Sequence, residues 1–173
     1  MGAEVKLRTL LLGIVIGIAI NELAETSERQ KAYRQARMTA DYLGKPLLVI
    51  GVPKRIAWYH HPGGDVTIDV DSSIDAAVPY QVADVRDIPY PDKYFGATYI
   101  SHVLEHLPTV DDVARSLNEM HRVSDAVFIA GPHKTSLTAW LHPDHRLWVT
   151  PTGDGYIVEQ REGVREVAMV RIK

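Results

Sequence analysis

Residues 82–107 read "VADVRDIPYPDKYFGATYISHVLEHL", and this stretch decides the fold. It opens on a short apolar run in which Asp84 is the acidic residue, and it then passes through a turn with two prolines. A second apolar run, residues 96–103, follows and has His102 near its end. Apolar runs of this length between turn residues are typical of buried strands. The stretch therefore predicts two strands of one sheet, each with a polar side chain near its carboxyl end.

The flanking sequence continues this pattern. Short apolar runs predict further strands at residues 46–51, 65–71 and 125–132. Residues 110–123 predict a helix, because their apolar side chains recur every three or four positions. Strands that alternate with helices indicate an α/β fold with a mostly parallel sheet, and ligands of such sheets bind at the carboxyl ends of the strands. The tail, residues 156–172, predicts a β-hairpin that turns near Glu162 and Gly163.

Polar residues and one glycine lie at or just after the predicted strands. They are Gly51, Asp69, Asp71, Asp84 and His102. Carboxylates at neighbouring strand ends are placed to accept hydrogen bonds from the hydroxyl and amino groups of a nucleoside. Any one acid taken alone can also be explained as a cap or a loop residue, Asp71 above all, since two serines follow it. The ordered set favours a nucleoside site.

His102, Glu105 and His106 also spell H-x-x-E-H, the arrangement of an inverted zinc-peptidase helix. Such a site needs both histidines on one face of a regular helix. Pro108 follows directly and strand-like sequence precedes, so a helix here would have fewer than two turns. His142 and His145 are a further pair, too few to specify a metal site. We therefore expect no metallopeptidase and no metal.

Residues 82–107, together with "DDVARSLNEMHRVSDAVFIAGP" at 111–132, resemble the central half of a class I S-adenosylmethionine-dependent methyltransferase of the small-molecule type 11 kind. The resemblance covers about residues 47–132 and implies a Rossmann-like fold with S-adenosylmethionine as cofactor. It implies that Asp69 or Asp71 faces the cofactor ribose and that Asp84 faces the adenine amino group. His102 would lie beside the methionine portion, and His102 or His133 would take a proton from the methyl acceptor.

The chain departs from this family at two positions that matter. The family's first loop reads D-x-G-x-G-x-G, whereas residues 49–55 read "VIGVPKR" and keep only Gly51. Gly96 replaces the aspartate that usually follows Phe95. Two functions therefore stay open. One is a membrane-anchored methyltransferase that acts on a small or lipidic acceptor. The other is a catalytically inactive, methyltransferase-like accessory subunit of a membrane protein complex.

The apolar run "LLLGIVIGIAI", residues 10–20, predicts contact with a membrane. As a helix it is about 16 Å long, against roughly 30 Å of hydrocarbon. Residues 5–23 reach about 28 Å if Lys6 and Arg8 extend toward the headgroups. We expect an uncleaved single-span anchor. A signal peptide and a buried core helix are the alternatives.

These patterns predict three parts: an anchor at residues 1–24, a helical stalk at 25–45 and a methyltransferase-like domain at 46–173. Four basic residues follow the apolar run within residues 29–37. Their number favours a cytoplasmic globular domain. Gly13 and Gly17 form a G-x-x-x-G pattern that would let two copies of the helix pack closely, although glycine is common in membrane helices in any case.

Composition excludes several classes of function. The formal net charge of −3 argues against a nucleic-acid partner bound through a global positive field. The sequence has no cysteine, which excludes disulfides and thiolate catalysis.

Overall fold

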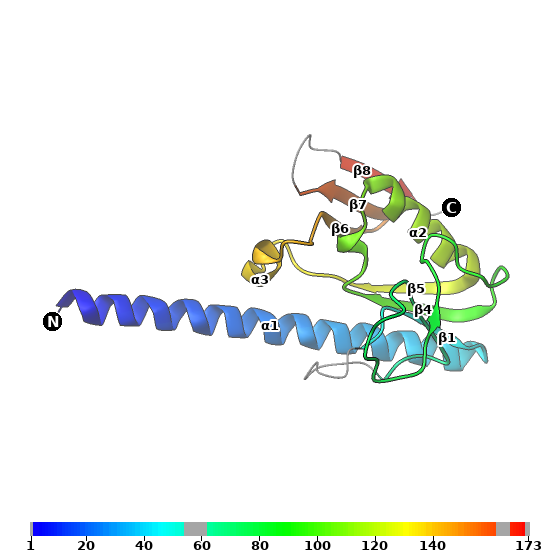
Figure 1. Cartoon of the computed structure of the whole chain (residues 1–173), viewed down its shortest axis with the longest axis horizontal. Coiled ribbons are helices and arrows are strands. Elements are labelled where there is room, and N and C mark those ends of the chain that lie inside the picture. The colour runs from blue at the N-terminus through cyan, green and yellow to red at the C-terminus, as the bar shows by residue number, and fades with distance from the viewer. Residues whose placement is uncertain (1, 54–61, 162–166, 172–173) are drawn as a thin grey trace.

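The computed structural model describes residues 2–53, 62–161 and 167–171. Figure 1 shows a compact α/β body with one long helix that extends well beyond it. The elements in chain order are α1 (Gly2–Leu43), β1 (Leu47–Ile50), β2 (Val66–Asp69), β3 (Gln81–Val82), β4 (Phe95–Ser101), the 3-10 turn η1 (Leu104–His106), α2 (Val110–Val123), β5 (Ser124–Ala130), α3 (Leu137–Leu141), β6 (Leu147–Thr152), β7 (Gly155–Gln160) and β8 (Val167–Arg171).

Five strands form one parallel sheet in the order β3-β2-β1-β4-β5. β1 pairs on one side with β2 and on the other with β4, so Val49 lies opposite both Thr67 and Tyr99. All four residues of β1 are buried, as expected for a central parallel strand with both faces covered. The strand order reverses direction between β1 and β4, and the crevice at such a reversal is where open α/β sheets bind ligands. The predicted Rossmann-like sheet is confirmed.

α2 covers one face of the sheet. Its predicted bounds, 110–123, are those of the structure. The side chain of Thr109 accepts a hydrogen bond from the backbone N–H of Asp112, which caps the first turn. Val113, Leu117 and Met120 are fully buried and join the core beneath β1 and β4. A capped helix with one apolar face thus forms where the sequence pattern places it.

The carboxyl-terminal half of α1 covers the other face. Ala36 and Ala40 are completely buried there against Tyr99 of β4. Small residues allow a close approach, and the closest point is at Gly96. A Cβ atom on Gly96 would lie 2.9 Å from Cα of Ala40 and 3.1 Å from Cβ of Lys45. The glycine that replaces the family's aspartate is therefore required for the packing of α1 on the sheet.

α1 runs antiparallel to the strands. Gly96, near the start of β4, meets Ala40. The hydroxyl of Tyr99, farther along β4, donates to the carbonyl of Arg29 at 3.3 Å. Beyond the end of β5, the N–H of His133 donates to Glu25 at 3.3 Å. The carboxyl ends of the sheet strands therefore face the side from which the apolar half of α1 projects (Figure 1, where β5 leads toward α3).

The apolar half of α1 is exposed. Among the described residues, α1 is a helix whose length and apolar composition would allow it to cross a membrane. The most apolar segment of α1 is 0% buried. The predicted anchor and stalk form a single uninterrupted helix. The part of α1 predicted as a stalk is packed on the sheet, because its residues Ala36 and Ala40 are buried against it.

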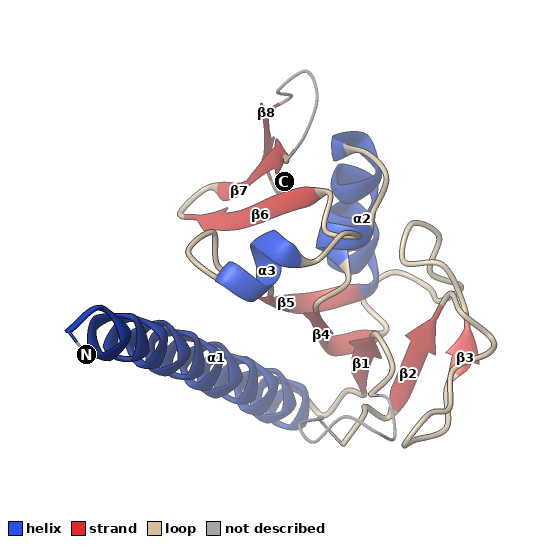
Figure 2. Cartoon of the chain, turned by 60° about the vertical axis from the view of Figure 1, so that its left-hand side comes forward, coloured by secondary structure: helices blue, strands red, loops and turns tan. Residues whose placement is uncertain are grey.

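The tail differs from the prediction. β7 and β8 are the antiparallel pair expected of the hairpin, and the turn near Glu162 and Gly163 lies outside the described residues. A further strand, β6, pairs with β7, so the tail is a three-stranded antiparallel sheet of order β6-β7-β8 rather than a hairpin. Figure 2 shows this sheet set apart from the parallel one, on the side of α2. Pro151 inside β6 hides the strand from sequence analysis, since proline disfavours a strand assignment.

Candidate functional site

A cavity of ≈ 100 Å³ opens at the carboxyl edge of the sheet, where β1, β2 and the segment after β3 meet. Gly51, Asp69 and Asp84 line it, together with Arg86 and Val103. Three of the residues predicted to hold the cofactor thus lie in one cavity. Asp71 is not among the lining residues, and its Oδ1 accepts hydrogen bonds from the N–H and hydroxyl of Ser73, at 2.8 and 2.6 Å.

Gly51 forms the turn that leaves β1. Its φ is +92°, in the left-handed region that glycine adopts most readily. A Cβ atom here would also lie 2.8 Å from Cγ2 of Val103. Gly51 therefore lets the segment after β4 approach β1, and the side chain of Val103 covers the backbone at this end of the cavity.

Asp69 is the last residue of β2 and holds the loops around the cavity. Its Oδ2 accepts from the N–H of Val52 at 2.9 Å, and its Oδ1 accepts from the N–H of Asp71 at 3.0 Å. A carboxylate oxygen has two lone pairs, so each oxygen can accept one more hydrogen bond. Asp69 is thus both a structural residue and an available acceptor.

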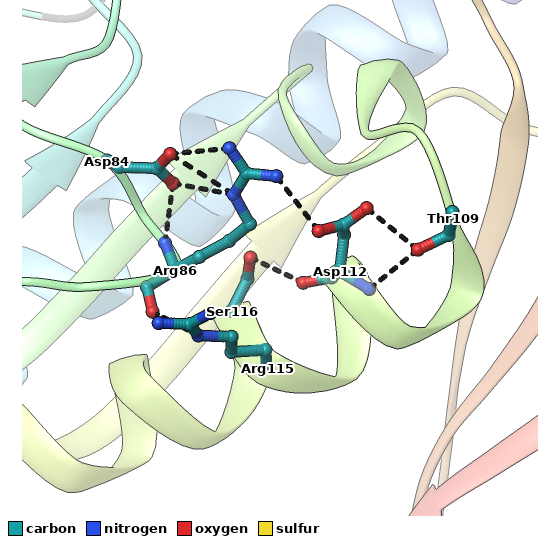
Figure 3. A network of polar contacts seen from close by, with 6 residues as sticks. All are labelled: Asp84, Arg86, Thr109, Asp112, Arg115 and Ser116. Atoms are coloured by element: carbon teal, nitrogen blue, oxygen red, sulfur yellow. Dashed lines mark hydrogen bonds and ion pairs between the residues drawn. The ribbon is translucent and has the colours of Figure 1, made fainter.

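Asp84 is held by an arginine that sequence analysis missed (Figure 3). Nη2 of Arg86 lies 2.6 Å from Oδ2 of Asp84, and Nε donates to Oδ1 at 3.0 Å. Nη1 of the same guanidinium donates to Oδ1 of Asp112, in the first turn of α2, at 2.9 Å. The carbonyl of Arg86 accepts from Nε of Arg115 at 2.9 Å. The hydrogen bonds from Arg86 hold the pKa values of Asp84 and Asp112 below their ordinary range, and both carboxylates raise the pKa of Arg86.

The two histidines predicted as catalytic lie outside this cavity. His102 follows β4, and its Nδ1 lies 3.1 Å from Oε1 of Glu105. It lines a separate, much smaller cavity of ≈ 10 Å³ with Glu105 and Trp148. His133 lies beyond β5, with Nε2 3.3 Å from Oε2 of Glu28 on α1. It lines a hollow of ≈ 500 Å³ between α1 and the start of the β6-β7-β8 sheet.

His145 is a further chemically competent residue near His102. It is only 8% exposed, and its Nε2 lies 4.0 Å from Oε1 of Glu105. Burial lowers the pKa of His145, so its imidazole is neutral at pH 7. H-x-x-E-H therefore does not form a peptidase helix, but the fold brings a third histidine to it from another part of the chain.

A comparison with protein families matches residues 64–126 to a family described as "Methyltransferase domain". This match confirms the resemblance to class I methyltransferases over residues 64–126. The match runs from the start of β2 to the first half of β5 and includes Asp69, Asp84 and His102, whereas Gly51 precedes it. No curated protein matches the chain. The methyltransferase match supports binding of S-adenosylmethionine as a property of the family.

Proposed function

We propose that the chain is a membrane-anchored methyltransferase that uses S-adenosylmethionine and acts on a small or lipidic acceptor. The observation that carries this proposal is the meeting of Gly51, Asp69 and Asp84 in one cavity at the edge of a methyltransferase sheet. In the proposal, Asp69 accepts hydrogen bonds from the ribose hydroxyls and Asp84 from the adenine amino group. Once the side chain of Val103 moves aside, Gly51 leaves the backbone accessible to the methionine portion. The cofactor supplies a methyl group bound to a positively charged sulfur.

The polar groups present fit a nucleoside, but the cavity has to widen. Cavities for drug-sized ligands and cofactors are roughly 300–1,000 Å³, whereas this one is ≈ 100 Å³. Arg86 and Val103 are the residues that restrict it, and both are partly exposed. Release of Asp84 by Arg86 frees the carboxylate that the adenine amino group needs. We therefore propose that binding is accompanied by movement of these two side chains.

The direction of the sheet supports an acceptor at the membrane surface. The strands' carboxyl ends face the apolar half of α1, so the cavity edge faces the same side as the proposed anchor. α3 lies beside α1 where the apolar run ends, because Thr138 donates to Glu22 at 2.5 Å (Figure 1). α3 exposes Trp140 and Leu141. Tryptophan is enriched at the membrane–water interface, so α3 is placed to touch the lipid headgroups.

Methyl transfer depends chiefly on alignment of donor and acceptor. The hollow of ≈ 500 Å³ that contains His133 is large enough for part of an acceptor and lies on the same side of the sheet. We assign to His133 the removal of a proton from an acceptor hydroxyl or amine, because its imidazole is exposed in this hollow. His102 has the buried Glu105 beside it and is less accessible to an acceptor.

Equilibrium titration tests this function. The full chain in lipid nanodiscs is titrated with S-adenosylmethionine and with its demethylated product, and we expect micromolar binding. Asp69→Asn weakens binding by at least about tenfold, the effect of about 1.4 kcal/mol. Asp71→Asn is the matched control, since Asp71 lies two positions away and outside the cavity. Absence of binding at millimolar ligand contradicts the proposal.

A second function is favoured by one specific observation. Arg86 binds both oxygens of Asp84, and Val103 covers Gly51, so the cavity as it stands is closed to a nucleoside. This state suits an inactive accessory subunit of a membrane complex. Arg86→Ala separates the two functions, because it frees Asp84. If neither the natural chain nor this variant binds the cofactor at millimolar concentration, the accessory function is supported.

A further inference from the structure

We propose that His102, Glu105 and His145 form a binding site for a divalent transition metal of the zinc type. The three residues come from different parts of the chain. His102 follows β4, Glu105 lies in η1, and His145 belongs to the segment between α3 and β6. The site is distinct from the cavity of Asp69 and Asp84, and it stands whether or not the chain is a methyltransferase.

The spacing of the donor atoms is close to that of a metal site. One donor atom from each residue lies within 4.8 Å of the other two. Nδ1 of His102 is 3.1 Å, and Nε2 of His145 is 4.0 Å, from the same oxygen, Oε1 of Glu105. Ligands of a tetrahedral zinc ion at about 2.0–2.2 Å from the metal lie about 3.3–3.6 Å from one another. A small rotation of His145 therefore brings the three atoms to zinc distances.

The carboxylate at the centre of the cluster is buried, and one of its two oxygens, Oε1, lacks a hydrogen-bond partner among the described residues. Glu105 is 3% exposed, and among the described residues no group donates a well-formed hydrogen bond to its Oε1. The short contact with His102 does not have hydrogen-bond geometry. A buried carboxylate oxygen that no donor satisfies is costly in free energy unless a cation compensates it. Oε1 thus points at a position where a dication is the appropriate occupant.

The backbone holds the ligands in place. His102 adopts φ = 54°, an unfavourable conformation for a residue with a side chain, and its N–H donates to the carbonyl of Ala130 at 3.0 Å. The carbonyl of Glu105 accepts from the N–H of Arg146 at 2.7 Å, which ties η1 to the segment that carries His145. Strained residues of this kind are found at ligand-binding positions when the surroundings hold them. The backbone positions of His102 and Glu105 are therefore fixed before any ion binds, and only the side chain of His145 has to adjust.

The ligand set selects the metal and leaves one position open. Two imidazoles and one carboxylate are the ligands of one class of catalytic zinc site, in which a water takes the fourth position. The cavity of ≈ 10 Å³ beside His102 and Glu105 has room for about one water. His142 stacks on His145 with ring centroids 4.3 Å apart, and His106 lies 4.8 Å from the same ring. These two rings surround His145 and restrict its orientation.

The test uses the full chain without an affinity tag, in detergent, after treatment with a chelator. Titration with Zn²⁺ alone should give one ion per chain at micromolar affinity or better. Co²⁺ alone should give the visible absorption of a low-coordinate site. Glu105→Gln and His145→Gln should each weaken Zn²⁺ binding by at least about tenfold, the loss that removal of one ligand causes at minimum. His133→Gln, the same change at an exposed histidine outside the cluster, should leave it unchanged.

Two further measurements keep the outcome decisive. Far-UV circular dichroism verifies that each variant is folded, and His102→Gln replaces any variant that is not, since His102 is partly exposed. His106, His142 and His145 also have donor atoms within 4.8 Å of one another. If His142→Gln abolishes binding and Glu105→Gln leaves it intact, the ion belongs to that second cluster and the proposal is overturned. The proposal is also overturned if the natural chain does not bind Zn²⁺ at concentrations up to about 100 μM, roughly 100 times the expected dissociation constant.

Discussion

Gly51 and Gly96 show why a single position in a family motif can have more than one meaning. Gly51 is the one glycine kept from the family's loop, and it allows close approach of Val103. Gly96 departs from the family, and it allows close approach of Ala40. Sequence analysis treats the first as a cofactor residue and the second as a loss. Neither contact is visible without the partner residue, because both partners are far away in the sequence.

Gly96→Ala is expected to destabilise the fold. The added methyl group would lie 2.9 Å from Cα of Ala40, and backbone cannot move aside as a flexible side chain does. Overpacking of this kind costs about 1–3 kcal/mol, which lowers Tm by about 2–4 °C per kcal/mol in a chain of this size. Thermal unfolding followed by circular dichroism measures it. Gly131→Ala is the control, because a Cβ atom there would have nothing within 4 Å.

Arg86→Gln is expected to lower stability at neutral pH more than in acid. Asp84 and Asp112 have folded-state pKa values below the ordinary 3.8 because of Arg86. The stabilisation is therefore present above pH 3.8 and is lost as the pH falls through the lower folded-state values. These side chains are partly exposed, so we expect about 1 kcal/mol at pH 7. Arg115 also faces this network from α2 and is unchanged in the variant.

The measurement is Tm of the natural chain and of the variant at pH 7 and at about pH 2.5. The difference between the two proteins should shrink in acid, because the stabilisation from these carboxylates declines as the pH falls below 3.8 toward their lowered pKa values. An equal difference at both pH values would show that Arg86 stabilises the fold through packing rather than through charge.

At the scale of elements, the sequence predicts whatever has a complete local pattern. α2 has an apolar stripe, a capping threonine and acidic residues in its first turn, and its predicted bounds are correct. The short apolar run that includes Asp84 predicts a strand, but β3 is only two residues long and ends before Asp84, which lies in an isolated bridge with Asp87. β6 was missed because of Pro151. Elements set by tertiary contacts rather than by local pattern are those that sequence analysis misjudges.

α3 is expected to contact lipid. Trp140 is 48% exposed beside the end of the apolar run, whereas Trp148 is 5% exposed. In nanodiscs that contain brominated lipids, tryptophan fluorescence should be quenched, and Trp140→Phe should remove more of this quenching than Trp148→Phe. Equal effects of the two substitutions, or no quenching, would contradict a membrane-facing α3.

At the scale of the whole molecule, the parallel sheet and the meeting of Gly51, Asp69 and Asp84 follow from the sequence, because polar residues after parallel strands must share one edge. The separate locations of His102 and His133 do not follow, since α1 and the β6-β7-β8 sheet divide that edge into compartments. The approach of His145 to Glu105 could not be predicted either. It depends on the path of an irregular segment that returns to η1.

If α1 is the membrane anchor proposed above, its unbroken course also sets how far the domain lies from the bilayer and how it is oriented. Every residue added to a rigid helix advances its far end by about 1.5 Å and turns it by about 100°. Seven helix-forming polar residues inserted between Ile20 and Asn21 would raise the domain by about 10 Å with nearly the same heading, whereas two would raise it by about 3 Å and turn it by about 200°. The distance of the domain from the bilayer and its orientation can thus be varied separately. The rate at which these variants modify a lipid acceptor would show which of the two quantities controls turnover.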